Sequence, residues 1–289
     1  MKLSVIIPCY NAATTIAVQL EALASQEWHQ PWEVIVADNG STDNTVAVAE
    51  LFQAKIPSLR IVDASAKKGA AYARNCGAKN AQAEALAFCD ADDEVAPGWV
   101  AAMGEALVKY DFISGRNFHH KLNESWVIQL HGSPESVGII ENPYLPFVIS
   151  CNMGVKRAVH EAVGGFDENF AKIEDIDYSW CIQEKGFKVH EVPEAIVNYR
   201  LRKSFSAICQ RAWGVGLYEA LLYKKHKHYG MPKILMSSRS FIKVPLDFVL
   251  EAVSLKIRDR SAIQKWLPML AWRAGQLQGC FKFGYLPPV

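Results

Sequence analysis

Short apolar segments that alternate with helical patterns constrain the first hundred residues of this chain more than any other feature. Four apolar runs have the length of buried strands: Leu3–Ile7, Trp32–Ala37, Leu59–Val62 and Ala85–Phe88. Helical spacing or capping residues fall between and after them, near residues 16–23, 43–52, 70–83 and 97–110. The alternation predicts an α/β domain with a mostly parallel sheet and helices on both faces.

The predicted strands end in polar residues. Because ligands of such sheets bind beyond the carboxyl ends of the strands, these residues are the first candidates for a site. The three segments are Pro8-Cys9-Tyr10-Asn11, Asp38-Asn39-Gly40-Ser41 and Asp90-Ala91-Asp92-Asp93.

The third segment places three carboxylates within four residues. Such carboxylates repel one another unless a cation lies between them, and an Asp-x-Asp pair can bind a divalent ion that also contacts phosphate oxygens. Alternatively, the segment is a solvated turn that caps the helix predicted to start near Pro97.

The net charge of +1 conceals an asymmetry. Residues 1–199 contain 15 Lys and Arg against 26 Asp and Glu, whereas residues 200–289 contain 16 against 4. We therefore expect two domains, 1–200 and a helical, basic region at 201–289. The basic region, with its aromatic residues and the helical spacing of 241–257, either docks on an anionic membrane surface or packs as a helical cap on the acidic domain.

Composition excludes several classes of protein. At 50% hydrophobic and 21% charged residues, the 289-residue chain can bury a core and is not disordered. Seven cysteines without a CxxC pair predict reduced thiols. The N-terminal apolar run is too short for a signal peptide and no run is long enough to span a membrane, so we expect a cytoplasmic protein.

Six segments in order resemble the inverting glycosyltransferases of family 2, nucleotide-sugar enzymes with the GT-A fold. The resemblance covers roughly residues 1–200. The segments are SVIIPCYN (4–11), VADNGSTDNT (36–45), KKGAAYARNCGAKNA (67–81), AFCDADD (87–93), SCNMGVKR (150–157) and VGGFDENFAKIEDIDYSW (163–180).

The resemblance implies where a nucleotide would bind. Pro8, Tyr10 and Asp38 would hold the nucleobase, although a capping turn with Ser41 also explains Asp38. Arg74 would face the nucleotide, and Asn75 could simply tie its loop.

The metal and the donor sugar are assigned in the same way. Asp90 would meet the ribose or the metal, and Asp92 would bind the metal directly, so a divalent cation, Mg²⁺ or Mn²⁺, is the expected cofactor. Asn152 and Gly165 match segments that approach the donor sugar or phosphate. The family often has a His near residues 193–204, where this chain has Arg202, which can bind diphosphate but no cation.

The Glu174-Asp175 pair matches the family's Glu-Asp motif, in which the Asp is the catalytic base. Transfer with inversion needs one carboxylate to take the proton of the acceptor hydroxyl, and we assign that role to Asp175. Glu174 would lie near the donor. The alternative is that these acids simply favour a helix N-terminus.

The expected function is metal-dependent, inverting transfer of a sugar from a nucleotide-diphospho-sugar to an acceptor hydroxyl, in cell-surface glycan or glycolipid synthesis. The acceptor could be lipid-linked. A degenerate member that binds nucleotide or a partner without turnover is the alternative. The chain lacks the G-x-G-x-x-G of a dinucleotide oxidoreductase and the Gly-rich first loop of a nucleotidyltransferase. The short KKHKH run (224–228) alone does not indicate a nucleic-acid partner.

Overall fold

A computed structural model describes residues 1–56, 58–132, 134–232, 246 and 260–285. These residues fall into two compact units. The first comprises Met1–Asn169 and Glu174–Leu201, and the second comprises Phe170–Ile173 and Arg202–Val289. The predicted helical pattern of 241–257 lies, apart from Leu246, outside the described residues.

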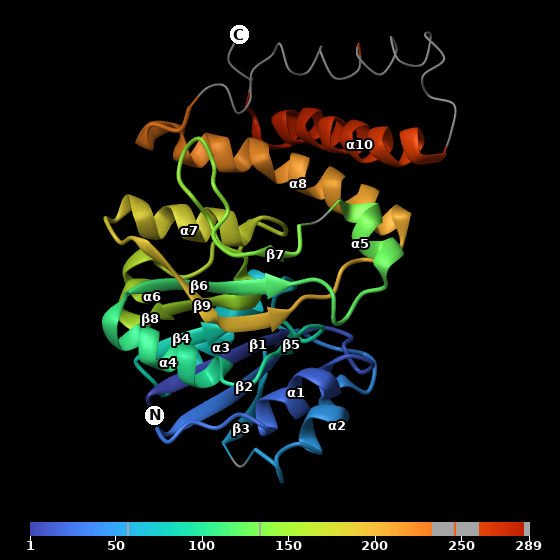
Figure 1. The fold of residues 1–289 in the computed structure, drawn as a ribbon. Helices are drawn as coiled ribbons and strands as arrows, with labels where there is room; N and C mark the ends of the chain where they lie inside the picture. Colours follow the sequence, from blue (N-terminus) through green and yellow to red (C-terminus); the bar gives the residue numbers. More distant parts are fainter. Residues whose placement is uncertain (57, 133, 233–245, 247–259, 286–289) are drawn as a thin grey trace. The chain divides into compact units, whose positions relative to one another are not determined.

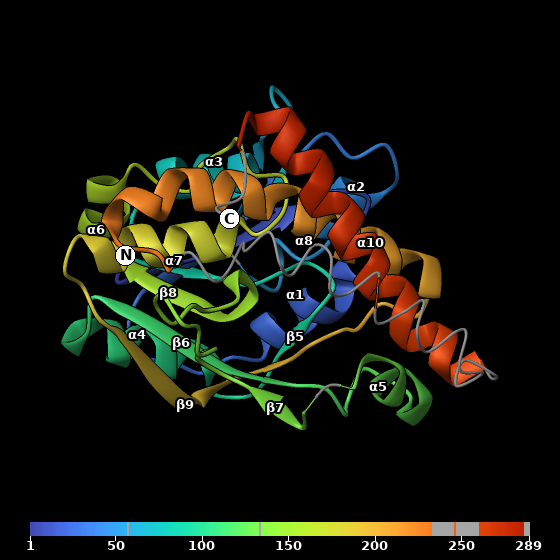
Figure 2. The ribbon, with the colours of Figure 1, turned by 90° about the horizontal axis from the view of Figure 1, so that it is seen from above.

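The first unit is built on one curled sheet (Figures 1 and 2), with the strand order β3-β2-β1-β4-β8-β6-β9-β5 and β7 paired to β6. The neighbours β3, β2, β1 and β4 run parallel, as do β6 and β9, whereas β8 is antiparallel to both β4 and β6. This confirms the predicted mostly parallel sheet. The strands are β1 (Leu3–Cys9), β2 (Trp32–Asp38), β3 (Leu59–Asp63), β4 (Ala85–Phe88), β5 (Glu94–Val95), β6 (Phe112–Phe118), β7 (Ser136–Val137), β8 (Met153–Lys156) and β9 (Val189–Asn198).

Helices cover both faces of this sheet. Because side chains of a strand alternate between its faces, Val5 and Ile7 of β1 join one apolar cluster with α1, α2 and α4, while Ile6 joins the other with α3, α6 and α7. The helices are α1 (Ile16–Ala24), α2 (Thr45–Glu50), α3 (Ala70–Asn80), α4 (Trp99–Lys109), α5 (Ser125–His131), α6 (Arg157–Val163) and α7 (Glu174–Glu184).

The second unit contains two long helices, α8 (Phe205–His226) and α10 (Arg260–Phe283). Glycines bring them close together, because a Cβ added to Gly216 would lie 2.1 Å from the carbonyl oxygen of Trp272. The segment 170–173 packs in the same unit, where the Phe170 ring lies 6.1 Å from that of Tyr218. Among the described residues, no helix combines the length and the apolar character needed to cross a bilayer.

Beyond residue 110 the first unit is assembled by long-range strand pairing. β9 spans Val189–Asn198 and pairs with β6 on one side and with β5 at its end. The segment 115–150 begins inside β6 and contains α5 and β7. These pairings are long-range and leave no local pattern.

Candidate active site

The polar ends of β1, β2 and β4 meet at one edge of the sheet. In the parallel register Cys9 is the partner of Asp38, and β4, which Asp90 follows, lies on the other side of β1. The pKa of the Cys9 thiol is raised well above its usual value, first by burial and then by the charges of Asp38, Asp90 and Asp92. The three predicted acids therefore surround the end of the first strand.

Asp38 performs two tasks with its two oxygens. Oδ2 accepts the backbone N–H groups of Gly40 and Ser41 at 3.2 and 3.1 Å, which is the capping turn considered from the sequence. Oδ1 is buried without a hydrogen-bond partner among the described residues. An acceptor that is buried without a hydrogen bond costs free energy unless a donor from a ligand bonds to it. Asp38 can therefore cap the turn through Oδ2 and accept a hydrogen bond from a ligand through Oδ1.

Asn39 fixes the loop that follows β3, which the sequence reasoning missed. Its Nδ2 donates to the carbonyl oxygens of Ala64 and Lys67, at 2.5 and 2.8 Å, and its Oδ1 accepts the N–H of Gly69 at 2.8 Å. Gly69 has a φ of +135° directly before α3. The only local sequence signal that Asn39 holds this loop is its position directly after Asp38, the last residue of β2.

Arg74 joins the two acidic segments of the predicted site. It lies on α3 and is 3% exposed, with Nη2 2.8 Å from Asp90 Oδ1 and Nη1 2.9 Å from Glu174 Oε1. Burial alone would lower the pKa of Arg74, but the charges of Asp90 and Glu174 outweigh it, so the pKa rises above its usual value. One permanent cation thus links the end of β4 to the start of α7.

Asp175 occupies the first turn of α7, next to Glu174. Its Oδ1 accepts the N–H of Ile176 at 2.9 Å, and its charge contributes to the raised pKa of Arg74. Ile173, immediately before the helix, has a φ of +58°, an unfavourable conformation for a β-branched residue. Such strain often occurs at functional sites.

Asp92 and Asp93 point to different environments. Asp92 is exposed, whereas Asp93 is 1% exposed and accepts the N–H of Arg200 through Oδ1 at 2.7 Å. Burial, followed by the charges of Asp90 and Asp92, raises the pKa of Asp93 well above its usual value. Asp93 thereby fastens the acidic turn to the residues after β9, a contact that the sequence did not predict.

The acidic turn fits a divalent cation. Asp90, Asp93 and Cys151 offer atoms within 4.8 Å of one another, and Asp93 Oδ2 is buried without a partner among the described residues. Carboxylate oxygens suit Mg²⁺ and Mn²⁺. Burial raises the pKa of the Cys151 thiol well above its usual value, so this group stays protonated and is a poor ligand for them. Asp90 and Asp92 remain the predicted ligands.

Asn75 ties the loop before α7 to α3, as considered from the sequence. Its Nδ2 donates to the Phe166 carbonyl at 2.8 Å, and its Oδ1 accepts the Phe166 N–H at 2.9 Å. Gly165 has a φ of +74°, and a Cβ there would lie 2.6 Å from Asn75 Oδ1. Gly165 is therefore required for this close approach, whether or not it also contacts a donor.

Asn152 is fully buried in the first unit. Its Oδ1 accepts the indole N–H of Trp99 at 2.8 Å, and its Nδ2 donates to the carbonyls of Arg116 and Ala195 at 3.1 and 3.0 Å. These bonds use the amide on protein groups and join α4, β6 and β9. Its predicted contact with the donor stays a prediction, as do the roles of the other site residues.

The remaining predicted residues are located as follows. Pro8 lies within β1 and is half-buried, and Tyr10 follows the strand with 53% of its surface exposed, which leaves the ring accessible for stacking. Arg202 is exposed and belongs to the second unit. Its predicted contact with diphosphate therefore stays a prediction.

Comparison with known proteins identifies relatives. Residues 4–164 match the model of glycosyl transferase family 2. The glycosyltransferase YibD of Escherichia coli (strain K12) is 44% identical over 96 residues, which are 33% of this chain and 27% of YibD. The chain thus matches little more than a quarter of that relative. The E. coli glucosyltransferase WfaP, named for UDP-Glc and a GlcNAc-diphosphoundecaprenol acceptor, is 29% identical over 208 residues, 68% of this chain and 76% of WfaP.

Solved structures show the same fold. The mannosyltransferase PcManGT of Pyrobaculum calidifontis, in complex with GDP-Man and Mn²⁺, has a TM-score of 0.66 at 18% identity, over 97% of this chain and 87% of that one. This likeness, together with the helix-flanked sheet of the first unit, confirms the expected GT-A fold. The family match spans more than half of the chain, and this protein belongs to glycosyl transferase family 2.

Proposed function

We propose that the protein transfers a sugar, with inversion, from a nucleotide-diphospho-sugar to an acceptor hydroxyl, and that it needs a divalent cation. The observation that carries the proposal is the double ion pair of Arg74, which brings the Asp-x-Asp turn and the Glu-Asp helix into one site. Acids from both segments are needed for this reaction, one set at the leaving group and one at the acceptor.

The nucleotide would lie across the ends of β1 and β2. Asp38 Oδ1 is a buried acceptor that a nucleobase N–H can satisfy, and the exposed Tyr10 ring can pack against the base. Arg74 would neutralise Asp90 and Glu174 and orient both toward the ribose and the donor rather than contact the base itself. The role expected for Arg74 from the family resemblance, facing the nucleotide, stays a prediction.

The cation, held by Asp90 and Asp92, would neutralise charge on the diphosphate as it leaves. Asp175 would accept the proton of the acceptor hydroxyl while the hydroxyl oxygen attacks the anomeric carbon. The N–H of Ile176 holds one oxygen of Asp175 in place, which orients the carboxylate for this step. Glu174, held by Arg74, would position the donor.

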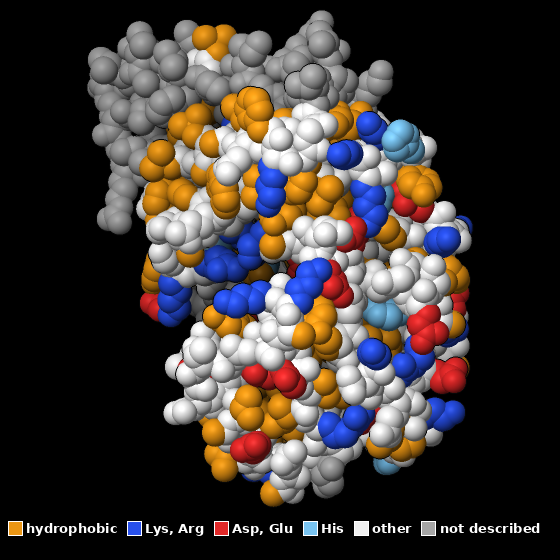
Figure 3. All heavy atoms as spheres, turned by 180° about the vertical axis from the view of Figure 1, so that it is seen from behind, with side chains coloured by type: hydrophobic (Ala, Val, Ile, Leu, Met, Phe, Trp, Pro, Cys, Tyr) orange, Lys and Arg blue, Asp and Glu red, His pale blue; other side chains and the backbone are white. Residues whose placement is uncertain are grey.

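A lipid-linked acceptor and a peripheral position on the inner membrane face complete the proposal. The name of WfaP includes a diphosphoundecaprenol acceptor. On α10, Leu267, Leu277 and Phe281 share one helix face with exposures of 42, 48 and 85%. Figure 3 shows exposed apolar side chains beside Lys and Arg side chains, a combination that suits an anionic bilayer surface.

The release of nucleoside diphosphate from a panel of sugar nucleotides, with and without Mg²⁺ or Mn²⁺, tests the transfer. We expect cation-dependent release that falls at least a hundredfold in Asp92→Ala and is unchanged in Asp111→Ala, whose carboxylate pairs with Lys156 at the surface. Nucleotide binding without turnover in the unaltered protein would support the degenerate alternative and refute the proposal.

Sedimentation with liposomes tests the membrane position separately. The protein should sediment with vesicles of anionic lipid at low salt, and Phe281→Glu should weaken this binding. Leu51→Glu, which alters an apolar side chain of the first unit that is 75% exposed, is the matched control. Absence of sedimentation would end the membrane proposal without affecting the transfer.

A further inference from the structure

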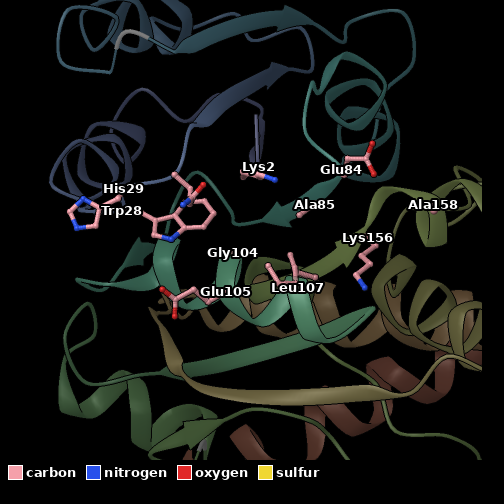
Figure 4. A pocket seen from close by; sticks show the side chains of 12 residues that line it. Lys2, Trp28, His29, Glu84, Ala85, Gly104, Glu105, Leu107, Lys156 and Ala158 are labelled. Carbon is pink, nitrogen blue, oxygen red and sulfur yellow. The ribbon is translucent and has the colours of Figure 1, made fainter.

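A pocket, drawn in Figure 4, is lined by residues at the starts of β1 and β4, at the edge of the sheet opposite the candidate active site. Its volume is about 720 Å³, within the range of small-molecule sites, and it opens where β1 and β4 begin rather than where they end. Seven residues of β1, at about 3.3 Å each, separate the two edges by about 20 Å. A ligand there would not compete with a nucleotide at Asp38.

An indole forms one wall of this pocket. Trp28, from the connection between α1 and β2, packs on α4 at Gly104, where an added Cβ would lie 2.2 Å from the ring. Leu107 and Val108 of α4 continue the apolar surface, and Val108 is 78% exposed. The glycine thus lets the aromatic ring lie directly on the helix backbone, which holds it rigidly.

The rim of the pocket mixes charges of both signs. Lys2 and Lys156 supply donors, and Glu84 and Glu105 supply acceptors, around the same apolar wall (Figure 4). Lys156 also pairs with Asp111 at 3.0 Å, which leaves other N–H groups of its ammonium for a ligand. An anion would meet the two carboxylates, and a cation would meet the two ammonium groups. A neutral molecule rich in hydroxyl groups can accept from the lysines and donate to the glutamates.

We propose that the Trp28 pocket binds a neutral oligosaccharide. The apolar C–H face of a sugar ring would pack against the indole, and its hydroxyls would bond to the charged rim. That this saccharide is part of the acceptor glycan rests on the proposed transferase function. The binding itself does not, because the pocket is complete without donor or cation.

Saturation-transfer NMR with three neutral trisaccharides, maltotriose, cellotriose and chitotriose, tests the proposal in the whole 289-residue chain without nucleotide or cation. At least one should receive saturation from the protein, and its affinity should fall at least tenfold in Trp28→Ala. Trp126→Ala, which removes an indole on α5 that is 47% exposed, is the matched control and should bind normally. Signals from none of the three, or signals that persist in Trp28→Ala, would overturn the proposal.

Two further measurements guard against a folding defect in Trp28→Ala. Lys2→Ala and Glu105→Ala alter exposed side chains and should weaken binding several-fold with unchanged melting temperature. In protein labelled with 5-fluorotryptophan, the resonance of Trp28 is the one that is missing from the spectrum of Trp28→Phe. This resonance should shift on addition of the trisaccharide, whereas the resonance of Trp126 should not. A shift at Trp126 instead would contradict the site. Donor hydrolysis is scored separately, so failure of either proposal leaves the other standing.

Discussion

In the first unit a buried cation, Arg74, is paired with two carboxylates, whereas in the second unit a half-buried carboxylate, Glu219, is held mainly by N–H donors. Glu219 accepts from the Trp272 indole at 2.9 Å and from the Gln276 amide at 2.5 Å. Burial raises the pKa of Glu219 to about 7, in spite of these bonds and the charge of Arg273. For Arg74 the neighbouring charges outweigh burial, and for Glu219 they do not.

The difference shows what each region is suited to do. Around Arg74 the carboxylates outnumber the cation, so the site has an excess of negative charge that a divalent cation can neutralise. Around Glu219 the contacts join α8 to α10, and the positive charge of Arg273 balances that of the carboxylate when Glu219 is ionised. The proposed function assigns ligand binding to the first region, whereas the contacts of the second join two helices and are predicted to depend on pH.

The largest expected effect concerns the acid that we assign as the catalytic base. Asp175→Asn should reduce transfer about a thousandfold, because general base catalysis contributes on the order of 10² to 10⁴ in rate. Nucleotide binding, followed by thermal shift, should be retained. Asp177→Asn, which alters a buried acid two residues along α7, is the comparison variant. Transfer at the native rate in Asp175→Asn would remove it as the base.

Loss of the two ion pairs of Arg74 should have the next largest effect. Arg74→Ala leaves Asp90 and Glu174 without their buried cation, which costs about 3 kcal/mol or more of unfolding free energy. Chemical denaturation measures this cost. Arg116→Ala breaks an exposed pair with Glu191 and should cost less than about 1 kcal/mol. Equal costs for the two variants would show that Arg74 does not hold the site together.

A smaller effect is expected at the nucleobase. Asp38→Asn should weaken nucleoside diphosphate binding about tenfold, since one hydrogen bond to a charged acceptor is lost. Asp63, the register partner of Asp38 on β3, is exposed and accepts the N–H of Ser65 at 2.8 Å. Asp63→Asn should leave the affinity unchanged, and calorimetric titration compares the two. Equal losses of affinity in the two variants would show that the nucleobase does not bind at Asp38 of β2.

The smallest effect is the pH dependence of the helix pair. Because the folded pKa of Glu219, about 7, exceeds its ordinary 4.5, the folded state binds more protons between these values. Stability should therefore fall as pH rises from about 5 to 7, and Glu219→Gln should flatten this slope by a few degrees in Tm. Glu21→Gln, at an exposed carboxylate, is the control. An unchanged slope in Glu219→Gln would place this carboxylate in water.

The sequence predicted the parts of the site that follow strands. Strand periodicity located the ends of β1, β2 and β4, and parallel pairing then required Asp38 and Asp90 to lie at one edge. The family resemblance supplied Asp175. Local patterns sufficed for Asp38 and Asp90 because these acids lie at the end of a strand or just after one.

The contacts that assemble the site could not be predicted from local pattern. Arg74 and Glu174 are 100 residues apart, and Asp93 and Arg200 are 107 apart. Such pairs depend on the path of the whole chain, which periodicity does not encode. The same limit applies to the length of β9, to the interior position of Asn152 and to the pocket beside Trp28.

The central claim is that the Asp-x-Asp turn and the Glu-Asp helix form one transfer site. Its most direct test is the anomalous scattering of Mn²⁺ in crystals grown with a nucleoside diphosphate. We predict one strong peak within coordination distance of Asp92, with the diphosphate between this ion and the start of α7, where Asp175 lies. A peak bound elsewhere, or a nucleotide that leaves α7 uncontacted, would contradict the assignment of both acidic segments to one transfer site.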